Sequence, residues 1–297
     1  MPGPGPDFAA HAAHVCAGFR ADGAVRRGRK SELLWGDVNG RPVIAKRLVK
    51  PNPVWEWYLE REMAVYRALM ERPPGVRFPQ LIAAEHGMLV IERLAGEPLA
   101  TRRRPAAALP IRTISALISI HDQLATWAGK LPPLPPSPRV RAQLRERLLE
   151  DPTSTWIRDG VRWCGRRGVI DEALARGIDE TLGSYAPVAF GHGDLLLRNV
   201  IADDDEDVGL VDWECAGTHS RDWDLALLWT QLAPQARTIV EDAVRDSGIR
   251  WRAFLGQVVF ALARELRFLD AFGPGNDDDR NKLRDEIAAV AERIHRA

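Results

Sequence analysis

Three polar residues lie close together in an otherwise apolar stretch, GHGDLLLRNVIADDDEDVGLVDWE, at positions 191–214. Asp194 precedes the apolar run NVIA, Asn199 begins that run, and Asp212 ends the run VGLVD. Carboxylate and amide oxygens are the ligands that Mg²⁺ prefers. Phosphoryl transfer needs one Asp that accepts or orients the acceptor hydroxyl, and an Asn and a second Asp that hold Mg²⁺ on the phosphates. The residue types of this stretch therefore fit phosphoryl transfer.

The two apolar runs, residues 199–202 and 208–212, predict a β-hairpin whose loop is the acidic run between them. In a symmetric hairpin Asn199 faces Asp212, and directly opposed residues have Cβ atoms about 5 Å apart. Two such side chains can bind one cation, and Asp194 lies at the same end of the hairpin. The alternative is that these residues only cap turns, but the presence of all three favours a metal and phosphate site.

The spacing of these residues also follows a known motif. His192-x-Asp194, four residues, Asn199 and then Asp212 after an apolar run is the order found in protein kinases. The sequence HGDLLLRNVI, followed by LVDWECAGTHSRDWDLALL, resembles the aminoglycoside phosphotransferase and choline kinase superfamily, which contains small-molecule kinases of the protein-kinase-like fold. The motifs that carry this resemblance lie within residues 191–229.

The resemblance implies a role for each residue of the motif. Asp194 is expected to be the catalytic carboxylate, and Asn199 and Asp212 the metal ligands. His192 is expected to brace the loop rather than act as a base. Asp224, in WDLALLW, is expected to hold the catalytic loop by hydrogen bonds, which is compatible with its place in the first turn of a helix.

Glu214 follows Asp212 in the sequence Asp-Trp-Glu. The choline-kinase-like form of this triplet suggests a ligand of a second metal ion or a residue that supports the metal ligands. A plain surface residue is an equally good interpretation.

A kinase also needs a strand Lys that holds the phosphates and a helical Glu that holds this Lys. Lys46 follows the apolar residues of PVIAKRL and is predicted to be that Lys, although a surface lysine on an edge strand would look similar. Three glutamates on the next helix compete for the pairing, Glu56, Glu60 and Glu62. Glu62 lies three residues from Leu59 and four from Tyr66, beside the apolar face, whereas Glu60 lies toward the solvent side. The spacing favours Glu62.

The nucleotide-binding loop is less distinctive. RRGRKSELLWG, residues 26–36, has no G-x-G-x-x-G motif, and the resemblance allows a shorter loop that contains Ser. Ser31 and the amides around Lys30 are the candidates for phosphate contacts, and an ordinary hairpin turn is the alternative. The adenine is expected to meet the backbone at Glu92 and Leu94, after the strand MLVI.

The surrounding elements predict an α+β fold with two lobes, a small antiparallel-sheet lobe and a larger, mainly helical lobe. Glu32–Trp35 and Val43–Leu48 are expected to be strands joined by the turn Asn39-Gly40, a strong hairpin signal. The first ninety or so residues are read as short strands around one helix. In that helix, Leu59, Met63, Tyr66 and Met70 recur at helical spacing before Pro73-Pro74. The later helices are expected at 110–130, 139–150, 155–183, 222–232, 235–247 and 250–271.

A change in composition marks the predicted lobes. Strand-like segments dominate residues 1–92, and helical segments dominate residues 99–297. Residues 93–98, which contain Ala95-Gly96, are predicted to be the hinge. The catalytic hairpin and the acceptor site are expected in the second lobe.

Charge and cysteine content narrow the class of protein. The 297 residues carry 41 Lys and Arg and 41 Asp and Glu, so there is no electrostatic case for nucleic acid or a membrane surface. Three widely spaced cysteines form neither a zinc motif nor a disulfide framework, which suits a reducing compartment. The N-terminal segment lacks the features of a signal peptide, and no apolar run is long enough to span a bilayer. A cytoplasmic protein, monomer or homodimer, is expected.

The acceptor is less defined by the sequence. The predicted cofactors are ATP and Mg²⁺, and the predicted acceptor is a hydroxyl of a small molecule, an antibiotic or a sugar- or nucleoside-like metabolite. Residues 135–185 carry nine Arg and eight acids, and residues 235–297 carry eleven basic residues and eleven acids. Neither segment has the acidic excess expected around a polycationic aminoglycoside. A choline-type acceptor would need an aromatic cage, with Trp223, Trp229 and Trp251 as possible members, although tryptophans at helical spacing usually belong to the core.

Three alternatives to this reading remain. One is a choline- or amino-alcohol-type kinase. Another is a pseudokinase, a non-catalytic nucleotide-binding protein of the same fold, but Lys46, Asp194, Asn199 and Asp212 are all present. The third is a protein kinase, which is disfavoured because the Asp-Phe-Gly and Ala-Pro-Glu motifs are missing.

Overall fold

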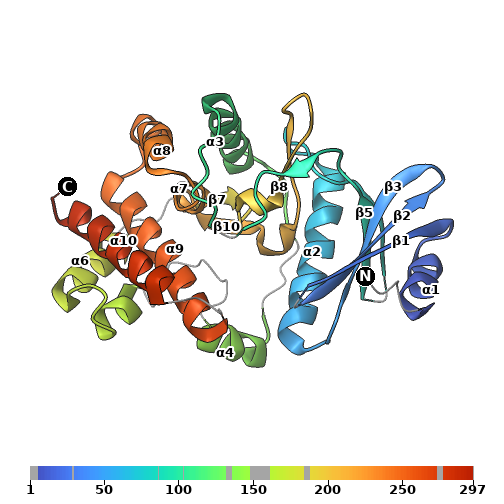
Figure 1. Cartoon of the computed structure of the whole chain (residues 1–297), viewed down its shortest axis with the longest axis horizontal. Helices are drawn as coiled ribbons and strands as arrows, with labels where there is room; N and C mark the ends of the chain where they lie inside the picture. The colour runs from blue at the N-terminus through green and yellow to red at the C-terminus, as the bar shows by residue number, and fades with distance from the viewer. Residues whose placement is uncertain are drawn as a thin grey trace. The chain divides into compact units, whose positions relative to one another are not determined.

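The computed structural model describes residues 6–28, 30–85, 87–102, 104–131, 136–147, 161–183, 188–272 and 277–296. The chain divides into two compact units (Figure 1). The first unit comprises Met1–Glu97, Ala128–Gln143 and Ile201–Ala216, and the second comprises Pro98–Trp127, Leu144–Val200 and Gly217–Ala297. The lobe boundaries expected from the sequence stay predictions. The grouping observed here differs from them in placing residues 128–143 and 201–216 with the first unit.

The first unit is built on a five-stranded antiparallel sheet of order β1-β2-β3-β5-β4. Its strands are β1 (Phe19–Arg27), β2 (Ser31–Val38), β3 (Arg41–Leu48), β4 (Leu81–Glu85) and β5 (Met88–Glu92). The predicted β2–β3 hairpin is confirmed, with Val38 opposite Arg41. Asn39 and Gly40 have φ angles of 55° and 85°, as a two-residue turn with positive φ at both positions requires.

Two helices pack on this sheet, α1 (Pro6–Val15) and α2 (Pro53–Glu71). Phe8 and Ala12 of α1 form a buried cluster with Val43 and Ala45 of β3. Alternate residues of a strand face opposite sides, so Lys46 points away from that cluster and meets α2. The expectation of a single helix in this region was wrong, because α1 also forms and covers the other face.

Helix α2 carries the residues that will meet Lys46. The Asn52 side chain accepts hydrogen bonds from the amides of Val54 and Trp55 and so caps the N-terminus. The helix ends at Glu71, just before the predicted Pro-Pro stop. Three of the four positions at helical spacing are buried, whereas Met70, next to the last residue of the helix, is 40% exposed.

The strands of the central hairpin are shorter than predicted. They are β8 (Val200–Ala202) and β9 (Val208–Leu210), which form a three-stranded sheet with β6 (Glu97–Pro98) in the order β6-β8-β9. Asn199 ends the 3₁₀ helix η1 (Leu197–Asn199), and Asp212 precedes the 3₁₀ helix η2 (Trp213–Cys215). The prediction that Asn199 and Asp212 are paired strand residues was therefore wrong. Asp212 has φ 65° and ψ 57°, a left-handed conformation that no strand ladder accommodates.

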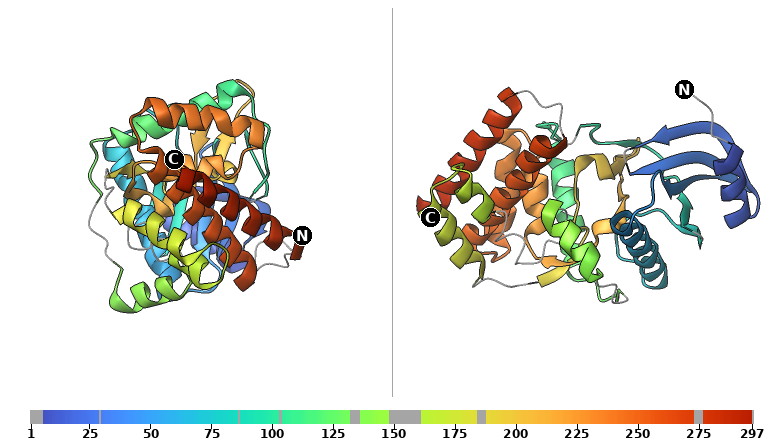
Figure 2. Two further views of the ribbon diagram at one scale, coloured as in Figure 1. Left: turned by 90° about the vertical axis from the view of Figure 1, so that its left-hand side faces the viewer. Right: turned by 90° about the horizontal axis from the view of Figure 1, so that it is seen from below.

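The second unit is mainly helical. Its helices are α3 (Ile111–Ala125), α6 (Glu172–Gly183), α7 (Trp223–Trp229), α8 (Pro234–Asp246), α9 (Trp251–Phe272) and α10 (Asp277–Arg296), and its two-stranded sheet pairs β7 (Val188–Gly191) with β10 (Gly217–Ser220). Helix α4 (Pro138–Arg147) spans the division between the units. Helices α10 and α6 both pack on α9 (Figure 2).

Most of the predicted helices of this unit are found. The prediction of one helix over residues 155–183 was wrong, because a turn at residues 167–170, with Gly168 at φ 65°, separates the helical residues 161–166 from α6. Helix α10 was missed because its sequence is dominated by charge, although its buried residues Leu283, Ile287, Val290 and Ile294 recur at helical spacing. The predicted segments at 139–150 and 155–183 include residues 148–160, which lie outside the described part of the chain. The predicted α+β class, with one antiparallel-sheet unit and one mainly helical unit, is confirmed. Among the described residues, no helix is long and apolar enough to cross a membrane.

Candidate active site

Lys46 is the centre of a buried ion cluster in the first unit. Its Nζ lies 2.7 Å from an Oε of Glu62 on α2 and 2.6 Å from an Oδ of Asp212. The side chains of Lys46 and Glu62 are 9% and 1% exposed. Burial alone would lower the pKa of Lys46, but the charges of Asp212 and Glu62 outweigh it and raise that pKa well above its ordinary value. The lysine is therefore fully charged at neutral pH.

Of the glutamates on α2 that could pair with Lys46, Glu62 is the one that contacts it. Glu62 lies on the buried face of α2, where its carboxylate meets the ammonium group, whereas Glu60 is exposed. The apolar spacing around Leu59 and Tyr66 thus identified the residue that contacts the lysine. The function of this ion pair stays a prediction.

Glu214 takes part in the same cluster. Its carboxylate forms an ion pair with Lys30, whose ammonium group lies 4.6 Å from the ring centre of Tyr58 and 5.2 Å from that of Trp55. The interpretation of Glu214 as a plain surface residue was wrong, since its side chain is only 14% exposed. Burial raises the pKa of the Glu214 carboxyl to about 7, against the opposing charge of Lys30.

The carboxylates of this cluster are suitable for a metal ion. One oxygen each from Glu62, Asp212 and Glu214 lies within 4.8 Å of the others. Three carboxylates against the two lysines Lys30 and Lys46 leave one negative charge when all are ionised. Hard carboxylate oxygens are the donors that Mg²⁺ takes, so the residues present fit that ion.

The predicted nucleotide loop joins β1 and β2. Ser31 is the first residue of β2, and its carbonyl accepts a hydrogen bond from the Gly28 amide. At the predicted adenine segment, the amide of Glu92 donates to the Gln80 carbonyl. A contact between adenine and Glu92 would therefore use the Glu92 carbonyl oxygen, and the contacts at Ser31, Glu92 and Leu94 stay predictions.

In the second unit, Asp224 holds the loop that carries Asp194. The Asp224 carboxylate, in the first turn of α7, accepts hydrogen bonds from the His192 amide at 2.7 Å and from the Gly193 amide at 2.9 Å. The predicted role of Asp224 in holding this loop is confirmed. His192 is fully buried, and its Nδ1 lies 3.4 Å from the Asp194 amide, a position that braces the loop as expected.

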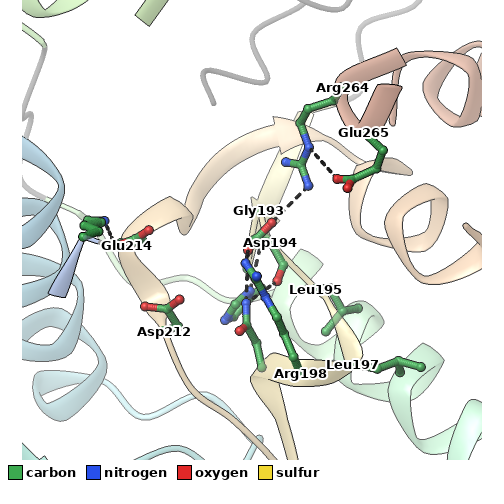
Figure 3. Close-up of polar contacts among 12 residues, drawn as sticks. Gly193, Asp194, Leu195, Leu197, Arg198, Asp212, Glu214, Arg264 and Glu265 are labelled. Atoms are coloured by element: carbon green, nitrogen blue, oxygen red, sulfur yellow. Dashed lines mark hydrogen bonds and ion pairs between the residues drawn. The ribbon is translucent and has the colours of Figure 1, made fainter. Parts of the chain in front are cut away.

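The carboxylate of Asp194 is bound on both of its oxygens (Figure 3). Asn199 Nδ2 donates to Oδ2 at 3.1 Å and to the Asp194 carbonyl at 3.0 Å. Arg264 Nη2 donates to Oδ1 at 3.1 Å, and Arg198 Nη2 lies 3.5 Å from Oδ2. The structure thus brings Asn199 to Asp194, although through η1 rather than through a strand.

Two residues of this site were missed from the sequence. Gln231 accepts a hydrogen bond from the Leu197 amide at 2.7 Å and donates to the Leu195 carbonyl at 3.1 Å, so it fixes the turn after Asp194. Arg264 lies on α9, in a run of apolar residues. The only signal for Arg264 was a charge inside an apolar helical segment, where burial requires a partner.

The sequence pattern of the Phosphotransferase enzyme family matches residues 33–269, most of the chain. The chain belongs to this family. The match spans Lys46, Glu62, Asp194, Asn199 and Asp212, the residues assembled above. It confirms the predicted superfamily and the predicted enzyme class, a small-molecule phosphotransferase.

Solved structures of similar fold cover nearly the whole phosphotransferase. The choline kinase of Streptococcus pneumoniae is 14% identical with a TM-score of 0.62, and covers 96% of this chain and 98% of its own. The macrolide 2'-phosphotransferase of Brachybacterium faecium is 16% identical with a TM-score of 0.58, and covers 96% of each chain. A putative fructosamine-3-kinase of Thermobifida fusca is 22% identical with a TM-score of 0.56, and covers 97% of this chain and 98% of its own. These likenesses confirm the protein-kinase-like fold. A search of curated proteins found no match.

Proposed function

We propose that this phosphotransferase moves the γ-phosphate of ATP, with Mg²⁺, to a hydroxyl of a small molecule, an antibiotic or a sugar- or nucleoside-like metabolite. The observation that carries the proposal is the buried Lys46, held at 2.7 Å from Glu62 and 2.6 Å from Asp212. A kinase requires such a lysine, charged and fixed by a helical glutamate, to hold the nucleotide phosphates.

On the nucleotide side, Lys46 binds the phosphates and Glu62 keeps its ammonium group in place. Ser31 and the amides near Lys30 contact the phosphates, and the backbone at Glu92 and Leu94 contacts the adenine. A non-catalytic nucleotide-binding protein usually lacks one of the reacting residues. This chain has Lys46, Asp194, Asn199 and Asp212, which supports catalysis over mere binding.

Asp212 and Asn199 hold the metal. When bound there, Mg²⁺ would supply positive charge to the phosphate oxygens. Asp212 shares its carboxylate with Lys46, so the lysine and the metal ligand are coupled through one group.

On the acceptor side, Asp194 orients the hydroxyl and accepts its proton. The acceptor oxygen forms a bond to the γ-phosphorus while the bond from that phosphorus to the bridging oxygen of ADP breaks. The proton passes to the Asp194 carboxylate and then to water. Asp224 acts by position, since it holds the loop that carries Asp194. Asn199, besides its proposed contact with the metal, also holds Asp194 through its amide nitrogen.

A choline- or amino-alcohol-type acceptor receives no support from the tryptophans. Trp223 and Trp229 are 1% and 2% exposed, and the Trp223 Nε1 donates to the Gly193 carbonyl. Both are core residues and are unsuited to an aromatic cage. Trp251 stacks on Phe254, with ring centres 5.5 Å apart. The cytoplasmic location, the monomeric or homodimeric state and any part in antibiotic resistance remain predictions, as do the absence of nucleic-acid and membrane partners.

The proposal is tested by a screen of hydroxylated small molecules for acceptor-dependent ADP release from ATP and Mg²⁺. At least one acceptor should give turnover that EDTA abolishes. Lys46→Met should abolish this turnover, whereas Lys50→Met, a change at an exposed lysine next to β3, should preserve it. Absence of Mg-ATP binding by calorimetry would overturn the proposal, as would turnover that survives Lys46→Met.

A further inference from the structure

Helix α9 carries two charges into the interior of the second unit. Residues 253–266 are all buried, and within this stretch Arg264 and Glu265 are 5% and 6% exposed. A buried charge is costly unless it is paired and hydrogen-bonded. A charged pair at this depth therefore needs specific partners.

The guanidinium of Arg264 has one strong partner and spare donors. Its Nη2 donates to Asp194 Oδ1 at 3.1 Å, and its Nε lies 3.8 Å from an Oε of Glu265. Its Cζ lies 5.5 Å from the ring centre of Trp223. A guanidinium has five N–H donors. Nε is enclosed and has no acceptor among the described residues. The hydrogen bond from Nη2 to Asp194 is the one that the guanidinium makes to the described residues, so its other N–H groups retain capacity for further oxygens.

The acids beside Arg264 are already compensated. One carboxylate oxygen of Asp194 pairs with Arg264 (Figure 3). The other accepts a hydrogen bond from Asn199 and lies near the guanidinium of Arg198. Glu265 lies against the same guanidinium. An ammonium group on an acceptor needs a carboxylate whose charge is not yet balanced, and at Asp194 and Glu265 it would compete with Arg264.

We propose, on the basis of the proposed function, that Arg264 is a specificity-determining residue of the acceptor site. One N–H of its guanidinium fixes Asp194, and its spare N–H groups bind an oxygen of the acceptor next to the reacting hydroxyl. A planar guanidinium fork matches a carboxylate best. The enzyme therefore takes acceptors with a carboxylate or hydroxyl beside the reacting hydroxyl and discriminates against those with an ammonium group there.

Two series of probes test this preference. D-Glycerate, glycerol and 3-amino-1,2-propanediol share a three-carbon skeleton, and D-glucuronate, D-glucose and D-glucosamine share a hexose ring. Acceptor-dependent ADP release gives kcat/KM for each probe, and calorimetry with Mg-ADP present gives its affinity. In the wild-type enzyme, kcat/KM for the acid or neutral member of each series should be at least about tenfold higher than kcat/KM for the amine. One charge-assisted hydrogen bond provides a difference of this size.

Variants of Arg264 separate its role from folding. Arg264→Gln should lower kcat/KM for the acid probe about 10- to 100-fold, mainly by raising KM. It should also reduce the preference for the acid probe over the amine. Arg264→Lys keeps the charge and loses the fork, so it should retain part of the preference and serve if Arg264→Gln fails to fold by circular dichroism. Arg252→Gln removes a charge from the same helix, twelve residues or about 18 Å away, and should match the wild type.

Several results of these experiments would overturn the inference about Arg264. A wild-type enzyme that prefers the amine members, or a preference unchanged in both Arg264 variants, overturns the inference. Failure of every oxygen-rich probe to bind the wild-type protein also overturns it. Loss of Mg-ATP binding in the same calorimetric experiment would instead overturn the proposed function, so the two failures are distinguishable.

Discussion

At the scale of single residues, the site depends on charges that hold one another in place. Lys46 stays charged in a buried position because Asp212 and Glu62 surround it. Asp194 is held by Asn199 and Arg264. Asp212 and Asp194 belong to different compact units and have different partners, so the removal of each carboxylate should have a different consequence.

We expect Asp212→Asn to fold and to lose Mg-ATP affinity by about 10- to 100-fold, the range for a charge-assisted contact. Folding should persist because Lys46 keeps its ion pair with Glu62. Calorimetric titration with Mg-ATP measures the loss. Asp204→Asn, an identical change in the exposed loop between β8 and β9, is the control. Unchanged affinity and turnover in Asp212→Asn would remove Asp212 from the site.

For Asp194→Asn we expect normal Mg-ATP binding and turnover lower by about 10²- to 10⁴-fold, the usual contribution of a general base. The amide keeps one oxygen for Arg264, and Asn199 keeps its hydrogen bond to the carbonyl of residue 194, so the loop, which Asp224 also holds, should stay in place. Steady-state ADP release and nucleotide titration on the same preparation separate the two effects, with Asp205→Asn as the exposed control. Equal losses of binding here and in Asp212→Asn would show that the roles are wrongly divided.

At the scale of elements, short connections position the chemistry. The loop after β7 is tied to the first turn of α7 by Asp224, and η1 is tied by Gln231 just beyond α7. Backbone N–H groups in a buried loop have no water to bond. The side chains of Asp224 and Gln231 therefore supply the acceptors that a neighbouring strand would supply in a sheet. The catalytic loop therefore depends on α7 for its shape.

Asp224→Asn should lower the free energy of unfolding by about 1.5–3 kcal/mol, because one of two buried backbone donors loses its acceptor and meets an NH₂ group. Urea denaturation with unchanged m-value is the measurement. Asp242→Asn on α8, a carboxylate 71% exposed, should change stability little. A stability equal to that of the wild type would contradict the role of Asp224 in holding the loop.

A second acid at the start of α7, Asp222, predicts a pH dependence. Burial raises its pKa to about 6 from an ordinary value near 3.8, although Ser220 donates a hydrogen bond to it. The pKa of Asp222 is higher in the folded than in the unfolded protein. Its contribution to the free energy of unfolding is therefore fully present below about pH 4 and is lost as the pH rises through about 6. Two pKa units correspond to about 3 kcal/mol as an upper limit.

The variant Asp222→Asn removes this titration. It should be more stable than the wild type at pH 7.5, by up to about 3 kcal/mol, and the difference should vanish near pH 4. Urea denaturation at pH 4, 5, 6 and 7.5 measures it. A stability difference that does not change with pH would contradict the raised pKa of Asp222.

At the scale of the whole molecule, charge is balanced. The chain carries 41 basic and 41 acidic side chains, and the C-terminal segment 235–297 carries eleven of each. The three acids that begin α10 form the most acidic run in that segment. Within α10, Asp277 pairs with Arg280 and Asp278 with Lys282, so part of this charge is neutralised in the helix.

A polycationic acceptor should therefore be phosphorylated poorly. A site for several ammonium groups needs several desolvated carboxylates held together, which repel one another without ligand. We expect neutral or singly charged compounds to exceed kanamycin-like aminoglycosides in kcat/KM at both low and high ionic strength. Efficient turnover of aminoglycosides that falls steeply with added salt, as screening of exposed pairs predicts, would refute this while leaving the kinase assignment intact.

The sequence alone determined the local features of this protein. Lys46 and Glu62 were identifiable because each lies at a set position in a regular strand or helix, where apolar neighbours reveal which side is buried. Asp194, Asn199 and Asp212 were identifiable because their spacing along the chain is that of the kinase motif. The β2–β3 hairpin was predictable because Asn-Gly adopts positive φ without side-chain strain.

Tertiary structure decided the contacts between distant segments. Arg264 lies 70 residues from Asp194, Glu214 lies 184 residues from Lys30, and Gln231 lies 34 residues from Leu197. No periodicity links such positions, because their meeting depends on how helices and loops pack. The 3₁₀ turns at Asn199 and Asp212 were hidden for the same reason. An apolar run predicts burial, but the backbone conformation at its end is set by the hydrogen-bond partners that the folded chain brings to it.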